Sequence, residues 1–429
     1  MHVRRFMAAG FTVALVGAAA VVVAAPAGAV AQTFTVTNTT DTGADTLRDV
    51  LENQIAAGDT VVLTAGATYT LDNCDLGDID VDADVTIEGH GATVEQTCTD
   101  RIFDTSDALT ISNATLTGGV SGSDGGAITS GSGALTLTGV RLIDNVSNED
   151  GGAIDSSGDV TVTDSLIQGN RTGGDGGAID DSEGGVHIRI VRSTIASNCA
   201  EGNGGAISSQ SDDAFTLVNS TVTGNTSGGN GAIDGQAEGT DVALVYSDVV
   251  GNTLDPEVDC GIPLFDNVES SADSSGPVKA AAVEGANVGI APAGTLSTFG
   301  SVIALPTGGE NCGVYDETSA TVSSGYNYSD DASCGLDAAT DKQGAANPLL
   351  GALADNGGPT PTLLPQATSP LVDAIPTAAC SGGDTLAGST ITTDQRGLVR
   401  PDVLNQKCDI GSVELQTELP PVIQPTFTG

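Results

Sequence analysis

Four residues that could do chemistry fall within one stretch of fifteen, Gly176–Ile190, which reads GGAIDDSEGGVHIRI. Asp180 and Asp181 could supply the carboxylate pair of a glycoside hydrolase. His187 lies beside Arg189, and an arginine can take a proton next to a uronate in a polysaccharide lyase. Asp180 and Asp181 are adjacent, however, so a strand would turn them to opposite faces. The stretch is either an active site or one unit of a repeat.

The sequence GGAI occurs four times and NGAI once, at spacings of 25 to 28 residues. Each repeat closes on an asparagine, and three apolar columns stand ten, eight and three residues before it. Two apolar residues two positions apart indicate a strand with one buried face, whereas the abundant glycine and threonine disfavour helices. We therefore predict an all-β parallel β-helix, a solenoid of about 26 residues per coil, whose like residues stack about 4.8 Å apart. The closing residues are Asn145, Asn170, Asn198, Asn225 and Asn252.

Both ends differ from the repeat. Arg4 and Arg5 precede an apolar stretch and the small residues up to Ala31, which predicts a signal peptide. Leu47, Val50, Leu51 and Ile55 then share one helical face, within a small α/β cap over the open end of the stack. The expected regions are 1–31 signal peptide, 32–72 N-terminal cap, 73–255 regular β-helix, 256–340 irregular coils, 341–415 irregular C-terminal cap and 416–429 flexible tail.

Region 341–415 carries a family resemblance. Its phrases PLLGALADNGGPT and DQRG…RP…CDIG resemble the choice-of-anchor Q domain of bacterial exported proteins, and the GGAI repeats resemble those of polymorphic outer membrane proteins. The resemblance implies right-handed winding and a secreted or surface-displayed, adhesive role, without a defined reaction. The tail QTELPPVIQPTFTG has no LPxTG motif, which favours free secretion or non-covalent association with the surface. Arg396 and Arg400 stand among Asp394, Asp402 and Asp409, which favours ion pairs that lock this region; a catalytic cluster is the alternative.

Eight cysteines, an even number in a chain expected to be exported, predict disulfides. Cys199 and Cys260 lie 61 residues apart, more than two coils, so stacking alone does not pair them. The expected bridges are Cys74–Cys98, Cys312–Cys334 and Cys380–Cys408. The net charge of −43 disfavours nucleic acid and anionic membranes as partners, and no later segment is apolar enough to span a membrane.

The repeat favours a structural interpretation of the stretch Gly176–Ile190. Alignment turns Ile188 and Ile190 inward, so His187 and Arg189 point outward, and Asp159 stands one coil before His187. This favours cross-strand ion pairs, although Asp159, His187 and Arg189 remain the catalytic candidates if the protein is an enzyme.

A second column precedes the glycine pairs. Asp124, Asp150 and Asp175 stack there, followed by Asn203, and could hold weakly bound Ca²⁺ between coils; solvated aspartates are the alternative. No other cofactor is expected.

These features predict a monomeric, secreted or surface-associated, non-catalytic protein that resembles adhesins. Rows of exposed threonine, aspartate and asparagine suit a long repetitive ligand such as a glycan or another cell-surface polymer, and Tyr246 is the main outward aromatic candidate. One alternative is a polysaccharide lyase or glycoside hydrolase that acts on an outer face of the β-helix. The other is a structural spacer.

Overall fold

The computed structural model describes residues 30–181, 185–210, 214–263, 285–314, 316–404 and 406–416. Nearly all of the expected signal peptide and most of the expected flexible tail fall outside these ranges, as do residues 264–284 of the expected irregular coils. Within them, no helix has the length and apolar character needed to cross a lipid bilayer.

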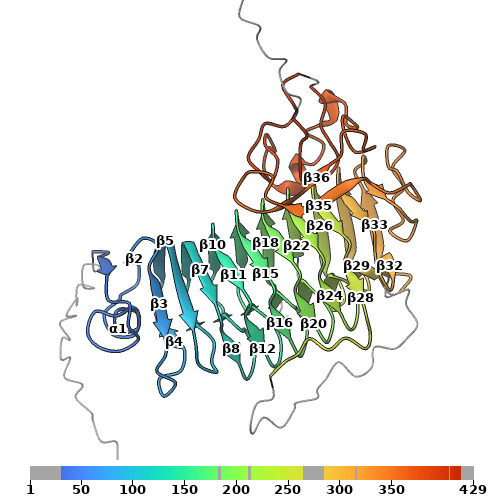
Figure 1. Cartoon of the computed structure of the whole chain (residues 1–429). Coiled ribbons are helices and arrows are strands. Elements are labelled where there is room, and N and C mark those ends of the chain that lie inside the picture. The colour runs from blue at the N-terminus through green and yellow to red at the C-terminus, as the bar shows by residue number, and fades with distance from the viewer. Residues whose placement is uncertain are drawn as a thin grey trace, which may run out of the picture. The chain divides into compact units, whose positions relative to one another are not determined.

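The chain winds as a parallel β-solenoid of about 26 residues per turn, as predicted (Figure 1). Its longest sheet has two faces, because β5 (Val85–Gln96) and β7 (Leu109–Thr117) bend around a corner that later coils divide into two strands. The first face contains β1 (Thr33–Val36), β2 (Asp59–Leu63), β10 (Leu135–Thr138), β14 (Val160–Thr163), β18 (His187–Val191), β22 (Ala214–Val218), β26 (Asp241–Val245), β30 (Thr295–Phe299) and β33 (Ala320–Ser323). The second face contains β3 (Thr68–Leu71), β11 (Arg141–Ile143), β15 (Leu166–Gln168), β19 (Thr194–Ala196), β23 (Thr221–Thr223), β27 (Asp248–Val250), β31 (Val302–Ala304) and β34 (Tyr328–Ser329).

Two further sheets complete each coil. A sheet of two-residue strands follows the closing asparagines: β8 (Val120–Ser121), β12 (Val146–Ser147), β16 (Arg171–Thr172), β20 (Cys199–Ala200), β24 (Thr226–Ser227) and β28 (Thr253–Leu254). The GGAI turns lead into a third sheet: β4 (Ile79–Val81), β6 (Phe103–Thr105), β9 (Ile128–Ser130), β13 (Ile154–Ser156), β17 (Ile179–Asp181), β21 (Ile207–Ser209), β25 (Ile233–Gly235), β29 (Gly285–Ile290) and β32 (Glu310–Val314).

The three predicted apolar columns form the interior. In the register of the first face, Leu135 lies beside Val160, which lies beside Ile188, and every member of the columns is at most 2% exposed. Burial of each such side chain contributes about 1.5–3 kcal/mol, but only a stack of coils provides it. The columns therefore explain both the repeat and the fold.

The closing asparagines form a continuous buried amide ladder. The Nδ2 of Asn170 donates to the Oδ1 of Asn198 at 2.9 Å, and the same bond recurs from coil to coil. The ladder continues into Asn287 and Asn311, beyond the point where the sequence period is lost. The glycine pairs also have a steric role, because a Cβ on Gly152 would lie 2.2 Å from the carbonyl oxygen of Gly177.

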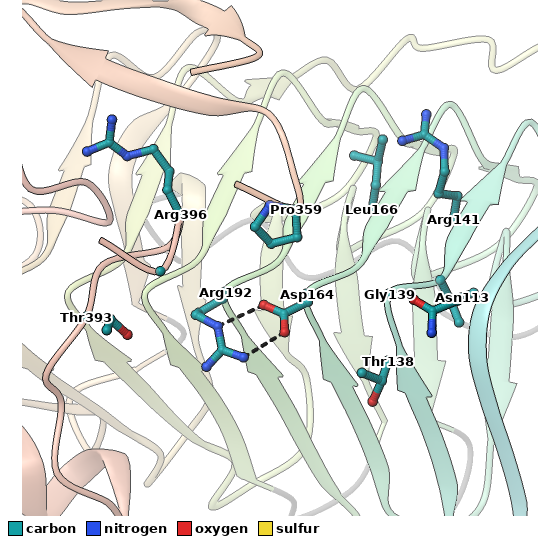
Figure 2. A pocket seen from close by; sticks show the side chains of 12 residues that line it. Asn113, Thr138, Gly139, Arg141, Asp164, Leu166, Arg192, Pro359, Thr393 and Arg396 are labelled. Atoms are coloured by element: carbon teal, nitrogen blue, oxygen red, sulfur yellow. Dashed lines mark hydrogen bonds and ion pairs between the residues drawn. The ribbon is translucent and has the colours of Figure 1, made fainter. Parts of the chain in front are cut away.

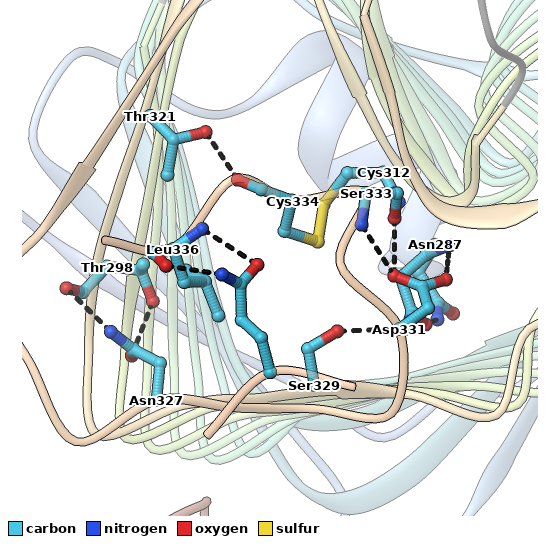
Figure 3. Close-up of a disulfide and its surroundings, with 12 residues drawn as sticks. Asn287, Thr298, Cys312, Thr321, Asn327, Ser329, Asp331, Ser333, Cys334 and Leu336 are labelled. Atoms are coloured by element: carbon cyan, nitrogen blue, oxygen red, sulfur yellow. Dashed lines mark hydrogen bonds between the residues drawn. A yellow bond between two sulfur atoms is a disulfide. The ribbon is translucent and has the colours of Figure 1, made fainter. Parts of the chain in front are cut away.

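Both ends of the stack are covered. At the N-terminal end, α1 (Leu47–Asn53) buries Leu47, Val50 and Leu51 as predicted, and its Arg48 forms an ion pair with Asp41. At the other end, the loop after β34 turns back over the last coil, where Leu336 joins the solenoid core and Cys334 is bonded to Cys312 (Figure 3).

All three expected disulfides are present, and Cys199 is also bonded to Cys260. The stacking of coils did not predict this fourth bridge, because the chain beyond β28 leaves the solenoid instead of adding another turn. It returns to earlier coils, where Arg171 donates to the carbonyl of Cys260 at 2.9 Å.

Residues 345–416 form a C-terminal lobe that lies against the outer surface of the later coils instead of over the end of the stack (Figure 1). It contains β35 (Leu350–Ala354), β36 (Thr362–Pro365), a 3-10 helix (Thr377–Ala379) and α2 (Asp384–Ala387). Residues of the expected choice-of-anchor phrases form the contact: Gln395 is fully buried and donates to the carbonyl of Ser193 and to Thr194 Oγ1.

Candidate functional site

Two of the three catalytic candidates on the first face lie near each other, whereas the third contacts the C-terminal lobe. His187 Nδ1 lies 3.6 Å from Asp159 Oδ1, and both side chains are more than 60% exposed. Arg189 instead donates from Nη2 to the carbonyl of Ala387 in the C-terminal lobe at 2.7 Å. An exposed pair of this kind contributes little to stability, and the structure orients Arg189 toward the lobe rather than toward His187 and Asp159.

The two aspartates of the opening stretch are both fully buried on β17 rather than presented to solvent. Asp180 lies beside Asp155 of the preceding coil. Burial, together with the charges of Asp150, Asp155 and neighbouring aspartates, raises the pKa of Asp180 well above its usual value. Its Oδ1 has no hydrogen-bond partner in the described ranges. This environment favours the neutral form of Asp180, whereas a hydrolytic nucleophile must be ionised.

The aspartates before the glycine pairs accept hydrogen bonds from backbone amides of the next coil. Asp124 Oδ1 accepts from the amide of Asp150, and Asp150 Oδ1 accepts from the amide of Asp175 at 2.7 Å. Burial raises the pKa of Asp150 to about 6. Among the residues with described positions, no group of three or more His, Cys, Asp or Glu side chains is arranged to hold a metal ion. Calcium at Asp124, Asp150 and Asp175 stays a prediction.

A hollow lies at the corner between the two faces, beside the C-terminal lobe. It has a volume of about 690 Å³, within the range of small-molecule sites. Figure 2 shows Asp164 paired with Arg192, and Pro359 of the lobe near Leu166 of the coils. We call it the corner groove; its lining is Asn113, Thr138, Gly139, Val140, Arg141, Asp164, Leu166, Arg192, Pro359, Thr393, Arg396 and Gly397.

The coil side of the groove is a column of left-handed turns. One residue per coil turns the chain from the first face to the second with a φ of 46–65°, a conformation that favours glycine and asparagine. We call this the corner column; it consists of Asn113, Gly139, Asp164, Arg192, Asn219, Tyr246 and Gly300.

The lobe covers the later half of the corner column. Asn219 donates to the carbonyl of Thr393, and Tyr246 is fully buried, with its hydroxyl on the carbonyl of Cys380 and Arg400 over its ring at 4.0 Å. The prediction that Tyr246 offers an outward aromatic platform is therefore wrong: its side chain does leave the coil, but the lobe packs over it.

A change of residue type on the first face marks where the lobe docks. In the coils that the lobe leaves uncovered, the last outward-facing residue of each first-face strand is a threonine: Thr138 in one coil and Thr163 in the next. It becomes Val218, Val245 and Phe299 where the lobe packs. This signal was available in the sequence, because only an external covering explains apolar residues on both sides of a strand.

The ion pairs expected for Arg396 and Arg400 are present within the lobe. Arg396 Nη2 lies 2.8 Å from Asp394 Oδ2, and Arg400 Nη1 lies 3.6 Å from Glu414 Oε2. Asp402 and Asp409 contribute differently, since the amides of both donate to Glu414.

Comparisons with protein-family models, curated proteins and solved structures find no match for this chain.

Proposed function

We propose that this protein is exported and binds polysaccharide chains without cleaving them, with the corner groove as its binding site. The observation that carries the proposal is the groove. Asn113, Gly139, Asp164 and Arg192 belong to four successive coils, so they extend over about 14 Å along the solenoid. A site elongated in this direction suits a chain of sugar units.

The groove offers groups of the kinds that bind sugars. Asn113 and Thr138 are exposed and can donate and accept hydrogen bonds, and Thr393 adds a further hydroxyl from the lobe. The coils before the lobe also leave a threonine row open on the first face, in which Thr86, Thr110, Thr136 and Thr161 are neighbours. A long chain bound in the groove can continue along this row.

Export is supported by the N-terminal sequence and by the pairing of all eight cysteines in four disulfides, which persist outside the cytosol. The resemblance of the lobe phrases to the choice-of-anchor Q domain supports an adhesin-like role, free or non-covalently attached to a bacterial surface. Arg189, bonded to the lobe, argues against the lyase alternative.

The test uses the chain from Gln32 to the end and a panel of soluble neutral and acidic polysaccharides. Binding is measured as retardation of the protein in gels that contain each polymer, and cleavage is measured as new reducing ends and unsaturated uronates. We expect retardation by at least one polymer and no new ends. New ends that disappear in Arg189→Ala would establish the enzyme alternative. Mobility unchanged by every polymer would overturn the proposal and favour a spacer.

A further inference from the structure

The corner groove gathers positive charge in an acidic protein. The chain has 13 lysines and arginines against 56 acidic residues, yet three arginines line this one hollow: Arg141, Arg192 and Arg396. Because clefts focus the field of the charges that line them, a guanidinium in the groove that no carboxylate neutralises attracts anions even on a molecule of opposite net charge.

Two of these arginines are held by carboxylates. Arg192 binds Asp164 through Nε at 2.8 Å and Nη2 at 2.7 Å, and Arg396 binds Asp394 and the carbonyl of Glu414. Each pair is close to neutral and fixes one wall of the groove.

Arg141 differs from the other two. Its side chain is exposed, and it has no ion pair or side-chain hydrogen bond within the described part of the chain. Its planar guanidinium can therefore receive a carboxylate or a sulfate through two parallel hydrogen bonds. The register places it one coil before Leu166 and one coil after Thr115.

The groove also provides a surface for the uncharged part of a sugar. Figure 2 shows Leu166 and Pro359 between the side chains of Arg141 and Arg396. An apolar floor next to a free guanidinium and to exposed Thr138 matches a sugar ring with an acidic substituent. Nucleic acid fits less well, because the lining has no aromatic side chain for base stacking.

Resting on the proposed function, we propose that the groove selects anionic polysaccharides, with Arg141 as the residue that binds the carboxylate or sulfate of one sugar unit. The shared chemistry is a planar or tetrahedral oxyanion on a glycan.

The experiment compares wild-type protein with Arg141→Ala, Arg141→Lys and Lys407→Ala. Lys407 is exposed on the lobe and does not line the groove, so its replacement removes the same charge elsewhere. Dissociation constants are measured for polygalacturonate, dextran sulfate and uncharged dextran at 0.15 M salt, after thermal unfolding confirms that each variant folds.

We expect Arg141→Ala to weaken binding of at least one of the two polyanions about tenfold, and Arg141→Lys to weaken it less. Lys407→Ala should leave it within twofold. Loss for polygalacturonate alone assigns the site to carboxylates, and loss for dextran sulfate alone assigns it to sulfates. Equal losses in Arg141→Ala and Lys407→Ala, or wild-type binding of dextran alone, would overturn this inference while the proposed function stands. Failure of the wild type to bind any polymer of the panel would instead overturn the proposed function.

Discussion

Individual polar residues stabilise this solenoid when they form hydrogen bonds from coil to coil, and Asn198 belongs to the buried asparagine ladder. Its Oδ1 accepts from the backbone N–H and the Nδ2 of Asn170, and its Nδ2 donates to Asn225 and to the carbonyl of Ile167. We expect Asn198→Ala to lower the free energy of unfolding by about 4 kcal/mol, because it leaves several buried groups without partners. Urea unfolding measures this loss. Asn148→Ala removes a turn asparagine whose side chain makes no such bond to the residues that the structure describes, and an equal loss there would refute the ladder's contribution.

Asp180 is fully buried among other carboxylates, and this burial raises its pKa well above the usual value. A carboxyl whose pKa is higher in the folded than in the unfolded state contributes stability below about pH 4 and loses it as the pH rises. Asp180→Asn keeps the shape without the ionisation, and its amide can donate to neighbouring aspartates. We therefore expect its Tm to exceed that of the wild type by more at pH 8 than at pH 5.

Asp159→Asn, at an exposed site, should show no such dependence on pH. If the Tm of Asp180→Asn differs from that of the wild type by the same amount at pH 5 and at pH 8, then the charge of Asp180 is balanced by a bound cation or another group. Bound calcium is the first such candidate to examine, and a wild-type Tm that falls on addition of chelator at pH 8 would identify it.

At the scale of elements, one column of the first face decides where the lobe docks. Val245, fully buried against the lobe, occupies the position that Thr163 occupies in an open coil. We expect Val245→Thr to cost about 1–3 kcal/mol, because it buries a hydroxyl in an apolar contact. Limited proteolysis should then cleave residues 345–416 faster than in the wild type. The reverse exchange, Thr163→Val, should change neither stability nor cleavage, and a lobe unaffected by Val245→Thr would show that the apolar column is not what holds it.

The same column shows what sequence could and could not predict. Inward columns such as Leu135, Val160 and Ile188 follow from period alone, because every coil must bury the same positions. The lobe contact and the Cys199–Cys260 bridge break the period, since each joins segments that no stacking rule relates. The corner groove could not be foreseen for the same reason: Arg141 comes from the coils, and Pro359 and Arg396 come from the lobe.

For the molecule as a whole, attachment of the lobe should depend on pH through two buried carboxyls. Asp248 of β27 accepts from the Ser412 hydroxyl at 2.6 Å, and burial raises its pKa to about 7. Burial likewise raises the pKa of Glu414, beside Arg400, to about 7. Both values lie above those of the unfolded chain, so the stability that these groups contribute is complete below about pH 4 and is lost as the pH rises through 7.

We therefore expect the unfolding free energy to fall by on the order of 2 kcal/mol between pH 5 and pH 8, with faster proteolysis of the lobe at the higher pH. Asp248→Asn keeps the bond to Ser412 without the ionisation and should flatten this dependence, whereas Asp241→Asn, exposed on the neighbouring strand β26, should not. Because the lobe forms one wall of the corner groove, polysaccharide binding should weaken over the same pH interval in the wild type. Binding that weakens equally in Asp248→Asn would exclude Asp248 as the group whose titration weakens it and leave Glu414 as the remaining candidate.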